Sequence, residues 1–190
     1  MINVVILNHF IGYPALEDAC SHALRYSKLL RLIQVVDAEN TIFLYSLTDT
    51  PDKKFNDIIE ISKTNGSKWL QISDKQSIES VLQNIKNKFS IDITQDNSTI
   101  ILGGTNTAGC LLRTSNFSAK QWVKKEFNVK FCLSICTDYE LDGINTVEKN
   151  QIAAVIMYQF IKENKFTDYI DVVYDPMDLV RAVDFYNPKQ

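Results

Sequence analysis

The chain has 190 residues, a formal net charge of −3 and 45% hydrophobic residues. This length suits one domain over residues 1–190, and the composition is that of a folded globular protein rather than a disordered chain. The mild negative charge gives no electrostatic reason to expect nucleic-acid binding, and no apolar run approaches the roughly 18 residues of a membrane span. The N-terminal residues do not resemble a signal peptide, so we expect a cytoplasmic location.

Apolar runs typical of strands alternate with amphipathic stretches typical of helices along the chain. The expected strands cover residues 3–7, 41–47, 69–72, 98–102, 129–136 and 169–174. The first expected helix begins at Pro14, and a short last helix begins at Pro176. The helices expected between them cover residues 52–63, 77–89, 108–126 and 146–164. We expect the tail after about residue 184 to be loosely ordered, because it is polar.

This alternation predicts an α/β fold. Strands that alternate with helices form right-handed βαβ units, which give a parallel sheet flanked by helices. The strands are continuous apolar runs, as expected when both faces of the sheet are covered. Ligands bind to such sheets at the carboxyl ends of the strands, near the point where the strand order reverses. Functional side chains are therefore expected just after the strands.

Three of the six glycines fall between residues 103 and 109, directly before Cys110. We expect this window to need backbone freedom or close backbone approach, as in a tight turn from a strand into a helix. The window is not a phosphate-binding P-loop, because the lysine and the hydroxyl residue of that motif are absent, nor does it have the spacing of a dinucleotide-binding loop. The N–H groups and dipole of a helix start favour a thiolate and can hold an oxyanion. Cys110 is thus a candidate nucleophile, and the alternative is a structural thiol.

Residues 104–110, GTNTAGC, resemble the G-x-x-T-x-x-C motif of the isochorismatase-like cysteine hydrolase superfamily. Residues 111–115, LLRTS, and 127–135, FNVKFCLSI, resemble the segments that follow it in that family, so the detailed resemblance covers about residues 98–139. It implies a three-layer sandwich with a six-stranded parallel sheet in the order 3-2-1-4-5-6. It also implies a catalytic set of an Asp after the first strand, a Lys after the third and the Cys after the fourth.

Carried over to this sequence, the family pattern makes Cys110 the nucleophile and Lys75 the cation that stabilises its thiolate. It implies an oxyanion hole formed by the backbone N–H groups of Asn106 and Cys110. The alternative for Lys75 is a solvated residue at a helix start.

Asn8 stands where the family has the aspartate. An amide can form hydrogen bonds but cannot accept the cysteine proton as a base at neutral pH. Three explanations stay open. The chain is a non-catalytic member that binds a ligand, another carboxylate such as Asp138 or Asp74 substitutes, or Lys75 and the helix dipole support a slower reaction. The alternative for Asn8 itself is an ordinary turn residue.

Other side chains near the predicted strand ends are candidates to line the pocket. They are His9, Phe10, Tyr13, Thr105, Asp138 and Tyr139. Ordinary packing or capping is the alternative for these residues. The two histidines lie in dissimilar places and no H-x-H or C-x-x-C pattern occurs, so we expect no metal and no cofactor. Cys132 and Cys136 are expected to pack the core from one face of the fifth strand.

The sequence therefore predicts a cysteine-dependent hydrolase that acts on a small amide or related C–N substrate through a covalent thioester. The resemblance also implies a homo-oligomer. The alternative is a catalytically impaired pseudoenzyme that uses the same pocket to bind a small ligand or partner, because Asn8 replaces the expected aspartate.

Overall fold

The computed structural model describes residues 1–10, 19–46, 53–105, 107–137, 146–174, 176–177 and 179. Residues 19–25, 137 and 146–150 are described by their backbone alone. The expected helix start at Pro14 and the tail after about residue 184 lie outside these ranges.

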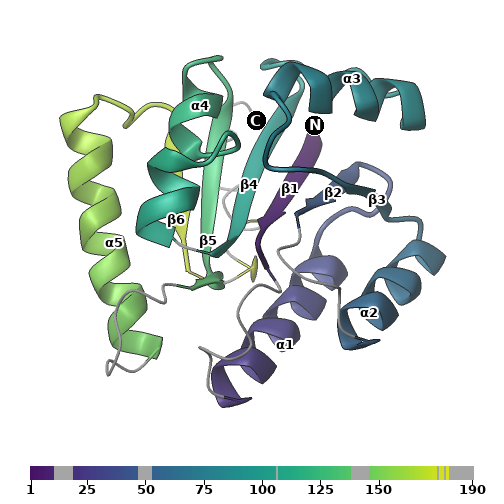
Figure 1. Cartoon of the computed structure of the whole chain (residues 1–190), viewed down its shortest axis with the longest axis horizontal. Coiled ribbons are helices and arrows are strands. Elements are labelled where there is room, and N and C mark those ends of the chain that lie inside the picture. The colour runs from purple at the N-terminus through teal and green to yellow at the C-terminus, as the bar shows by residue number, and fades with distance from the viewer. Residues whose placement is uncertain are drawn as a thin grey trace, which may run out of the picture.

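Six parallel strands form one sheet in the order β3-β2-β1-β4-β5-β6, which confirms the predicted fold class and strand order. Figure 1 shows the six strands β1 (Ile2–Asn8), β2 (Thr41–Tyr45), β3 (Lys68–Gln71), β4 (Ser98–Thr105), β5 (Asn128–Thr137) and β6 (Ile170–Val173). The strand order reverses between β1 and β4, which pair in register from Ile2 opposite Ser98 to Asn8 opposite Gly104. The carboxyl ends of these two strands therefore form the switch point at which ligands bind in such sheets.

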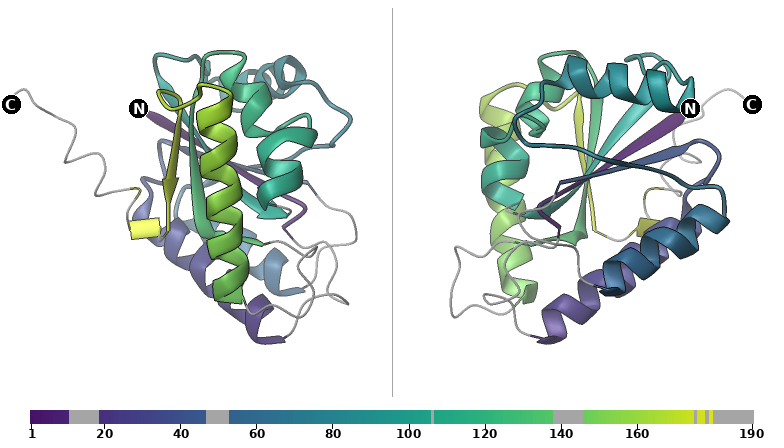
Figure 2. Two further views of the ribbon diagram at one scale, coloured as in Figure 1. Left: turned by 90° about the vertical axis from the view of Figure 1, so that its left-hand side faces the viewer. Right: turned by 45° about the vertical axis from the view of Figure 1, so that its right-hand side comes forward.

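Helices cover both faces of the sheet (Figure 2). One face carries α1 (Ala19–Val35) and α2 (Lys53–Thr64), and the other carries α3 (Ile78–Phe89), the π-helix η1 (Thr107–Thr114), α4 (Ala119–Val123) and α5 (Thr146–Glu163). Val4 and Ile6 of β1 point into the core beneath α3, whereas Val5 and Leu7 point into the core beneath α1. Since successive side chains of a strand point to opposite faces, a strand between two helical layers is apolar at every position.

The helix expected over residues 108–126 is two separate helices. An N–H group of Ser115 donates to the carbonyl of Cys110 at 3.1 Å, which closes η1 with the wide i→i−5 spacing of a π-helix. The chain then turns before α4 begins. In this turn Asn116 Nδ2 donates to the carbonyl of Asp74 at 2.8 Å, so the turn is bound to the segment after β3 rather than continued as helix.

Two cysteines of β5 are buried, as predicted, but they face opposite sides of the sheet. Cys132 belongs to the core beneath α1 and α2, and Cys136 to the core beneath the helices of the other face. The pairing of β4 with β5 shifts between Leu102 opposite Phe131 and Gly104 opposite Cys136. This irregularity interrupts the alternation of side chains, so the expectation of one shared face is wrong.

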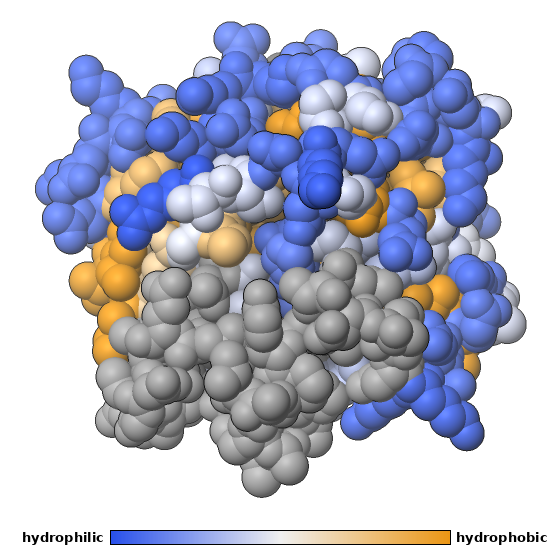
Figure 3. Space-filling view, viewed as in Figure 1, coloured by the Kyte–Doolittle hydropathy of each residue, from blue (hydrophilic) through white to orange (hydrophobic). Residues whose placement is uncertain are grey.

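Figure 3 shows one face of the molecule, in the orientation of Figure 1. Polar side chains cover most of its described part, and apolar side chains show in smaller areas between them. Among the described side chains of α5, Val155 and Tyr158 are the most exposed apolar ones. None of the described helices combines the length and the apolar character that crossing a membrane requires.

Candidate functional site

The ends of β1 and β4 approach each other so closely that one position must be glycine. A Cβ atom on Gly104 would lie 1.9 Å from the backbone oxygen of Asn8, and Gly104 has a φ of +113°. A Cβ on Gly103 would lie 2.5 Å from Cδ1 of Ile135. These two glycines are part of β4 and allow close packing of neighbouring strands, which fits the expected need for backbone freedom or close backbone approach. They lie in the strand itself rather than in the turn before the helix.

Asn8 is fully buried at the end of β1, where its amide is oriented by Ser46. The Ser46 hydroxyl donates to Asn8 Oδ1 at 2.9 Å and accepts the backbone N–H of His9 at 3.1 Å. Asn8 Nδ2 is buried and has no hydrogen-bond partner among the described residues. An unpaired buried donor costs about 1–3 kcal/mol. An acceptor oxygen of a bound ligand would remove that cost.

His9 follows Asn8 and contacts the segment after β3. His9 Nε2 lies 2.7 Å from Asp74 Oδ2, and the side chains of His9 and Asp74 are 20% and 40% exposed. The segment that joins β3 to α3 crosses the sheet, which brings Asp74 to the end of β1 (Figure 2). His9 Nδ1 and Asp74 Oδ1 are buried and have no partner among the described residues. This pair and Asn8 thus carry three unused polar atoms at one place.

The backbone of His9 is also held in an uncommon conformation. Its φ is 48°, in the left-handed region that few residues other than glycine adopt. The Thr105 hydroxyl donates to the His9 carbonyl at 3.3 Å, and Thr105 itself is buried. Since Thr105 ends β4 and His9 follows β1, this hydrogen bond joins the two segments just beyond the paired residues of the two strands.

Cys110, the predicted nucleophile, lies in the first turn of η1, which follows β4 almost directly. The next two residues, Leu111 and Leu112, are fully buried and anchor η1 against the core. Cys110 is partly exposed and its thiol is free. The structure therefore places a partly exposed cysteine on the helix that leaves the switch point.

Lys75 does not join Asn8 and His9 in the structure. Its side chain is exposed and lines a surface pocket of about 350 Å³ together with Asn116, Gln121 and Lys125. Its neighbour Asp74 is the residue of this segment that reaches the end of β1. The role of Lys75 beside Cys110 stays a prediction.

Phe10 is buried, and its ring meets that of Tyr26 edge-to-face with centroids 6.0 Å apart. It belongs to the core beneath α1 and α2, which fits the packing alternative. The remaining expected site residues lie outside the described part of the chain. They are Tyr13, Asn106, Asp138 and Tyr139.

Sequence reasoning missed Ser46 and the pairing of His9 with Asp74. Ser46 comes directly after β2 and Asp74 a few residues after β3, so both follow carboxyl ends of strands. The signal was present for Ser46, but the expected strand over 41–47 placed it inside the sheet. The contact between His9 and Asp74 depends on the path of the segment after β3, for which the sequence carries no pattern.

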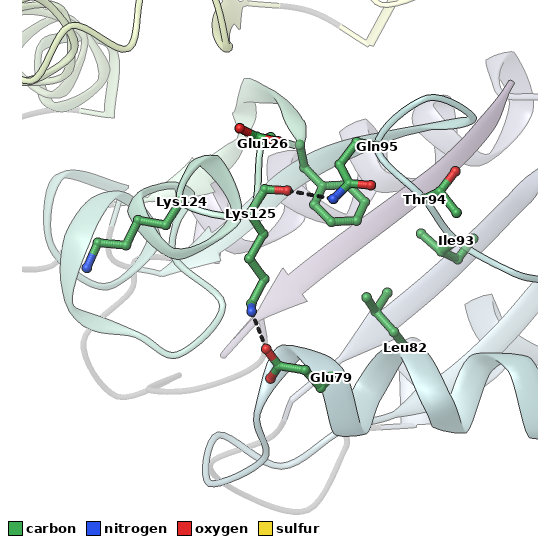
Figure 4. Close-up of a pocket in the computed structure, with 9 residues that line it drawn as sticks. Glu79, Leu82, Ile93, Thr94, Gln95, Lys124, Lys125 and Glu126 are labelled. Carbon is green, nitrogen blue, oxygen red and sulfur yellow. Dashed lines mark hydrogen bonds and ion pairs between the residues drawn. The ribbon is translucent and has the colours of Figure 1, made fainter.

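A second pocket, of about 340 Å³, lies away from the switch point (Figure 4). Its lining residues come from α3 and from the segments directly before β4 and β5, at the amino ends of these strands. The ammonium group of Lys125 contacts the carboxylate of Glu79, and Gln95 Nε2 donates to the Lys125 carbonyl at 3.1 Å. The hydrogen bond from Lys125, with a backbone N–H and Ser77 as further donors, lowers the pKa of Glu79 from 4.5 to about 2.

We expect Glu79 to titrate with a midpoint near pH 2 in an NMR titration of the side-chain carboxyl. Because the folded pKa is lowered, the contribution to stability is present above pH 4.5 and is lost as the pH falls toward 2. Lys125→Met should return the midpoint toward the ordinary value, and Lys124→Met is the matched control. An unchanged midpoint in Lys125→Met would contradict the assignment of the shift to Lys125.

No protein-family model matches this sequence, and no curated protein is significantly similar to it. Among the described residues no three His, Cys, Asp or Glu side chains gather in a way that could hold a metal ion. The fold, the switch point and the residues found there are therefore what a function can be proposed from.

Proposed function

We propose that the chain is a cysteine-dependent hydrolase of the isochorismatase-like type that acts on a small amide or related C–N substrate. The observation that carries this proposal is the partly exposed Cys110 in the first turn of the helix after β4. That helix leaves the switch point of a sheet with the order 3-2-1-4-5-6, where α/β proteins bind their ligands. Asn8 and His9 add unused hydrogen-bonding atoms at the same edge.

In the proposed reaction the Cys110 sulfur attacks the carbonyl carbon of the substrate. A C–S bond forms, the C–N bond breaks, and the amine leaves with a proton. Water then hydrolyses the thioester and regenerates the thiol. The backbone N–H groups of Asn106 and Cys110 stabilise the oxyanion, Lys75 stabilises the thiolate, and Asn8 Nδ2 donates to an acceptor oxygen of the substrate.

We expect iodoacetamide at pH 7 to alkylate Cys110 at least about tenfold faster than the thiol of a synthetic peptide covering residues 105–115, because helix N–H groups and dipole favour the thiolate. Peptide mass spectrometry on a time course gives both rates. The buried Cys132 and Cys136 should react more slowly still. A Cys110 rate equal to that of the peptide would contradict the activated nucleophile.

The proposed hydrolase activity is then tested on a panel of small amides. Cys110→Ser should abolish the release of ammonia or amine from these amides. Cys132→Ala, which removes another thiol of the chain, should retain this activity. When a substrate is mixed with wild-type protein and the reaction is quenched in acid, an acyl group should remain on Cys110. Intact-mass measurement of the protein detects this group.

A second candidate function is favoured by the amide at the end of β1. Asn8 is fully buried and cannot act as a base, which suits a pseudoenzyme that binds a ligand or partner without turnover. An amide that raises the unfolding temperature of both wild type and Cys110→Ser, with no product from either, would support this alternative.

A further inference from the structure

The turn after α2 holds the one asparagine of the sequence that a glycine follows, Asn65 before Gly66. Both residues are exposed. Gly66 has a φ of +88°, and apart from its chain neighbours no atom lies within 4 Å of where a Cβ atom would stand. Glycine adopts such a positive φ without steric cost, and it has no side chain that could shield its own backbone nitrogen. The Asn65 side chain and the Gly66 nitrogen are therefore neighbours in an open, exposed turn.

The hydrogen bonds that close this turn lie at the end of a helix. The Gly66 N–H group donates to the Lys63 carbonyl at 3.0 Å, and the Ser67 N–H group donates to the Ser62 carbonyl at 3.2 Å. Both acceptors belong to the last turn of α2. Helix ends fray, and exposed backbone hydrogen bonds open at a small cost in free energy. The Gly66 nitrogen therefore loses its partner at times while the core stays folded.

We propose that Asn65 deamidates spontaneously in the folded protein and ages to a mixture of aspartate and isoaspartate. The Gly66 backbone nitrogen attacks Cγ of the Asn65 amide, so a C–N bond forms to this nitrogen and the bond from Cγ to Nδ2 breaks. The amide proton of Gly66 leaves with Nδ2 as ammonia, and a cyclic imide remains. Water then opens the imide. Opening between Cγ and the nitrogen gives aspartate, whereas opening at the Asn65 backbone carbonyl gives isoaspartate, in which the chain runs through Cγ.

Asn97 lies in a setting that opposes the same reaction. It precedes Ser98, which is also a small residue. Both ends of the Asn97 amide are hydrogen-bonded, because Oδ1 accepts the N–H of Thr94 and Nδ2 donates to the Asp92 carbonyl, each at 2.9 Å. Ser98 itself is buried at the start of β4. An attack on Cγ would break these bonds and distort the strand, so Asn97 is an internal control within the same chain.

The modification acts on the junction between α2 and the edge strand β3. Either product places a new carboxylate just after the C-terminus of α2, where the helix dipole disfavours a negative charge. Isoaspartate also lengthens the backbone by a methylene group, inside the loop that the hydrogen bond from Ser67 to Ser62 closes. This junction lies at the amino end of β3, whereas the switch point lies at the carboxyl ends of β1 and β4. The inference is therefore independent of the proposed hydrolase function.

Ageing of the full chain in neutral buffer tests the proposal, with a synthetic peptide covering residues 60–70 aged beside it. Peptide mass spectrometry should show Asn65 gaining about 1 Da, at a rate within about tenfold of the rate in the peptide. Asn97 should stay unmodified over the same period. Gly66→Ala, whose methyl group shields the nitrogen, should lower the rate at least about tenfold. A rate in the folded protein more than about tenfold below that of the peptide would overturn the inference, as would equal modification of Asn97.

Amide hydrogen exchange at Ser67 measures what the modification does to the turn. In the isoaspartate form, isolated by chromatography, this amide should exchange at least about tenfold faster than in the unmodified protein, because the longer backbone breaks its bond to Ser62. Asn65→Asp carries the same new charge on a backbone of normal length, and its exchange should stay within about twofold of wild type. Unchanged exchange in the isoaspartate form, or equally fast exchange in Asn65→Asp, would overturn the effect assigned to the longer backbone.

Discussion

Gly104→Ala is expected to lower the free energy of unfolding by at least about 3 kcal/mol or to prevent folding, because it forces a steric clash inside the sheet. The new Cβ would lie 1.9, 2.8 and 2.9 Å from the backbone oxygen, carbon and nitrogen of Asn8. These are backbone atoms of a central strand, so they cannot move away without breaking the ladder between β1 and β4. The φ of +113° adds backbone strain to the clash. Urea unfolding followed by circular dichroism measures the change.

Gly66→Ala is the matched control for this prediction. Gly66 also has a positive φ, of +88°, but a Cβ there would have no atom within 4 Å. Its substitution should cost only about 1–2 kcal/mol of backbone strain. The difference between the two variants isolates the contact with Asn8. Equal destabilisation of both would contradict the close approach of β1 and β4.

The sheet was predictable because its signals are local. Strand β1 is apolar at every position from Val4 to Leu7, and all four side chains are fully buried between two helical layers. The start of α3 was equally predictable from the sequence, because Ser77 is a typical N-cap residue. In the structure its hydroxyl accepts the backbone N–H of Ser80 at 3.2 Å. The strand order came from the resemblance, and the structure has that order.

The details of the site depend on contacts between distant segments, which leave no local pattern. Gly103 and Gly104 were expected near a turn, because glycine clusters between patterned segments mark turns and loops. Their actual role depends on Ile135 and Asn8, which approach them from neighbouring strands. The orientation of Asp74 toward His9 likewise follows from a segment that crosses the sheet.

Asn8→Asp is expected to lower the free energy of unfolding by about 3–5 kcal/mol at pH 8, because it places an ionised carboxylate at a fully buried position. Ser46 can donate to one carboxylate oxygen, as it does to Asn8 Oδ1. The other oxygen takes the place of Nδ2, which has no hydrogen-bond partner among the described residues. Asn65→Asp, at an exposed turn residue, should change the free energy by no more than about 0.5 kcal/mol.

The pH dependence of this variant identifies the cause. Burial raises the pKa of the new carboxyl group above its value in the unfolded chain. The unfolded state then loses the proton first as the pH rises above about 4, so the cost relative to wild type grows by about 1.4 kcal/mol per pH unit until the folded group also ionises. Guanidinium unfolding of both proteins at pH 5 and pH 8 should therefore give a larger difference at pH 8. A cost that is equal at both pH values would point to lost packing instead of buried charge.

The same variant separates the two proposed functions. If Asn8 donates Nδ2 to the substrate, Asn8→Asp removes a donor that the reaction uses, and turnover of an amide substrate should fall. A gain of about tenfold or more would instead mean that a carboxylate is what the site lacks. That result would favour the pseudoenzyme.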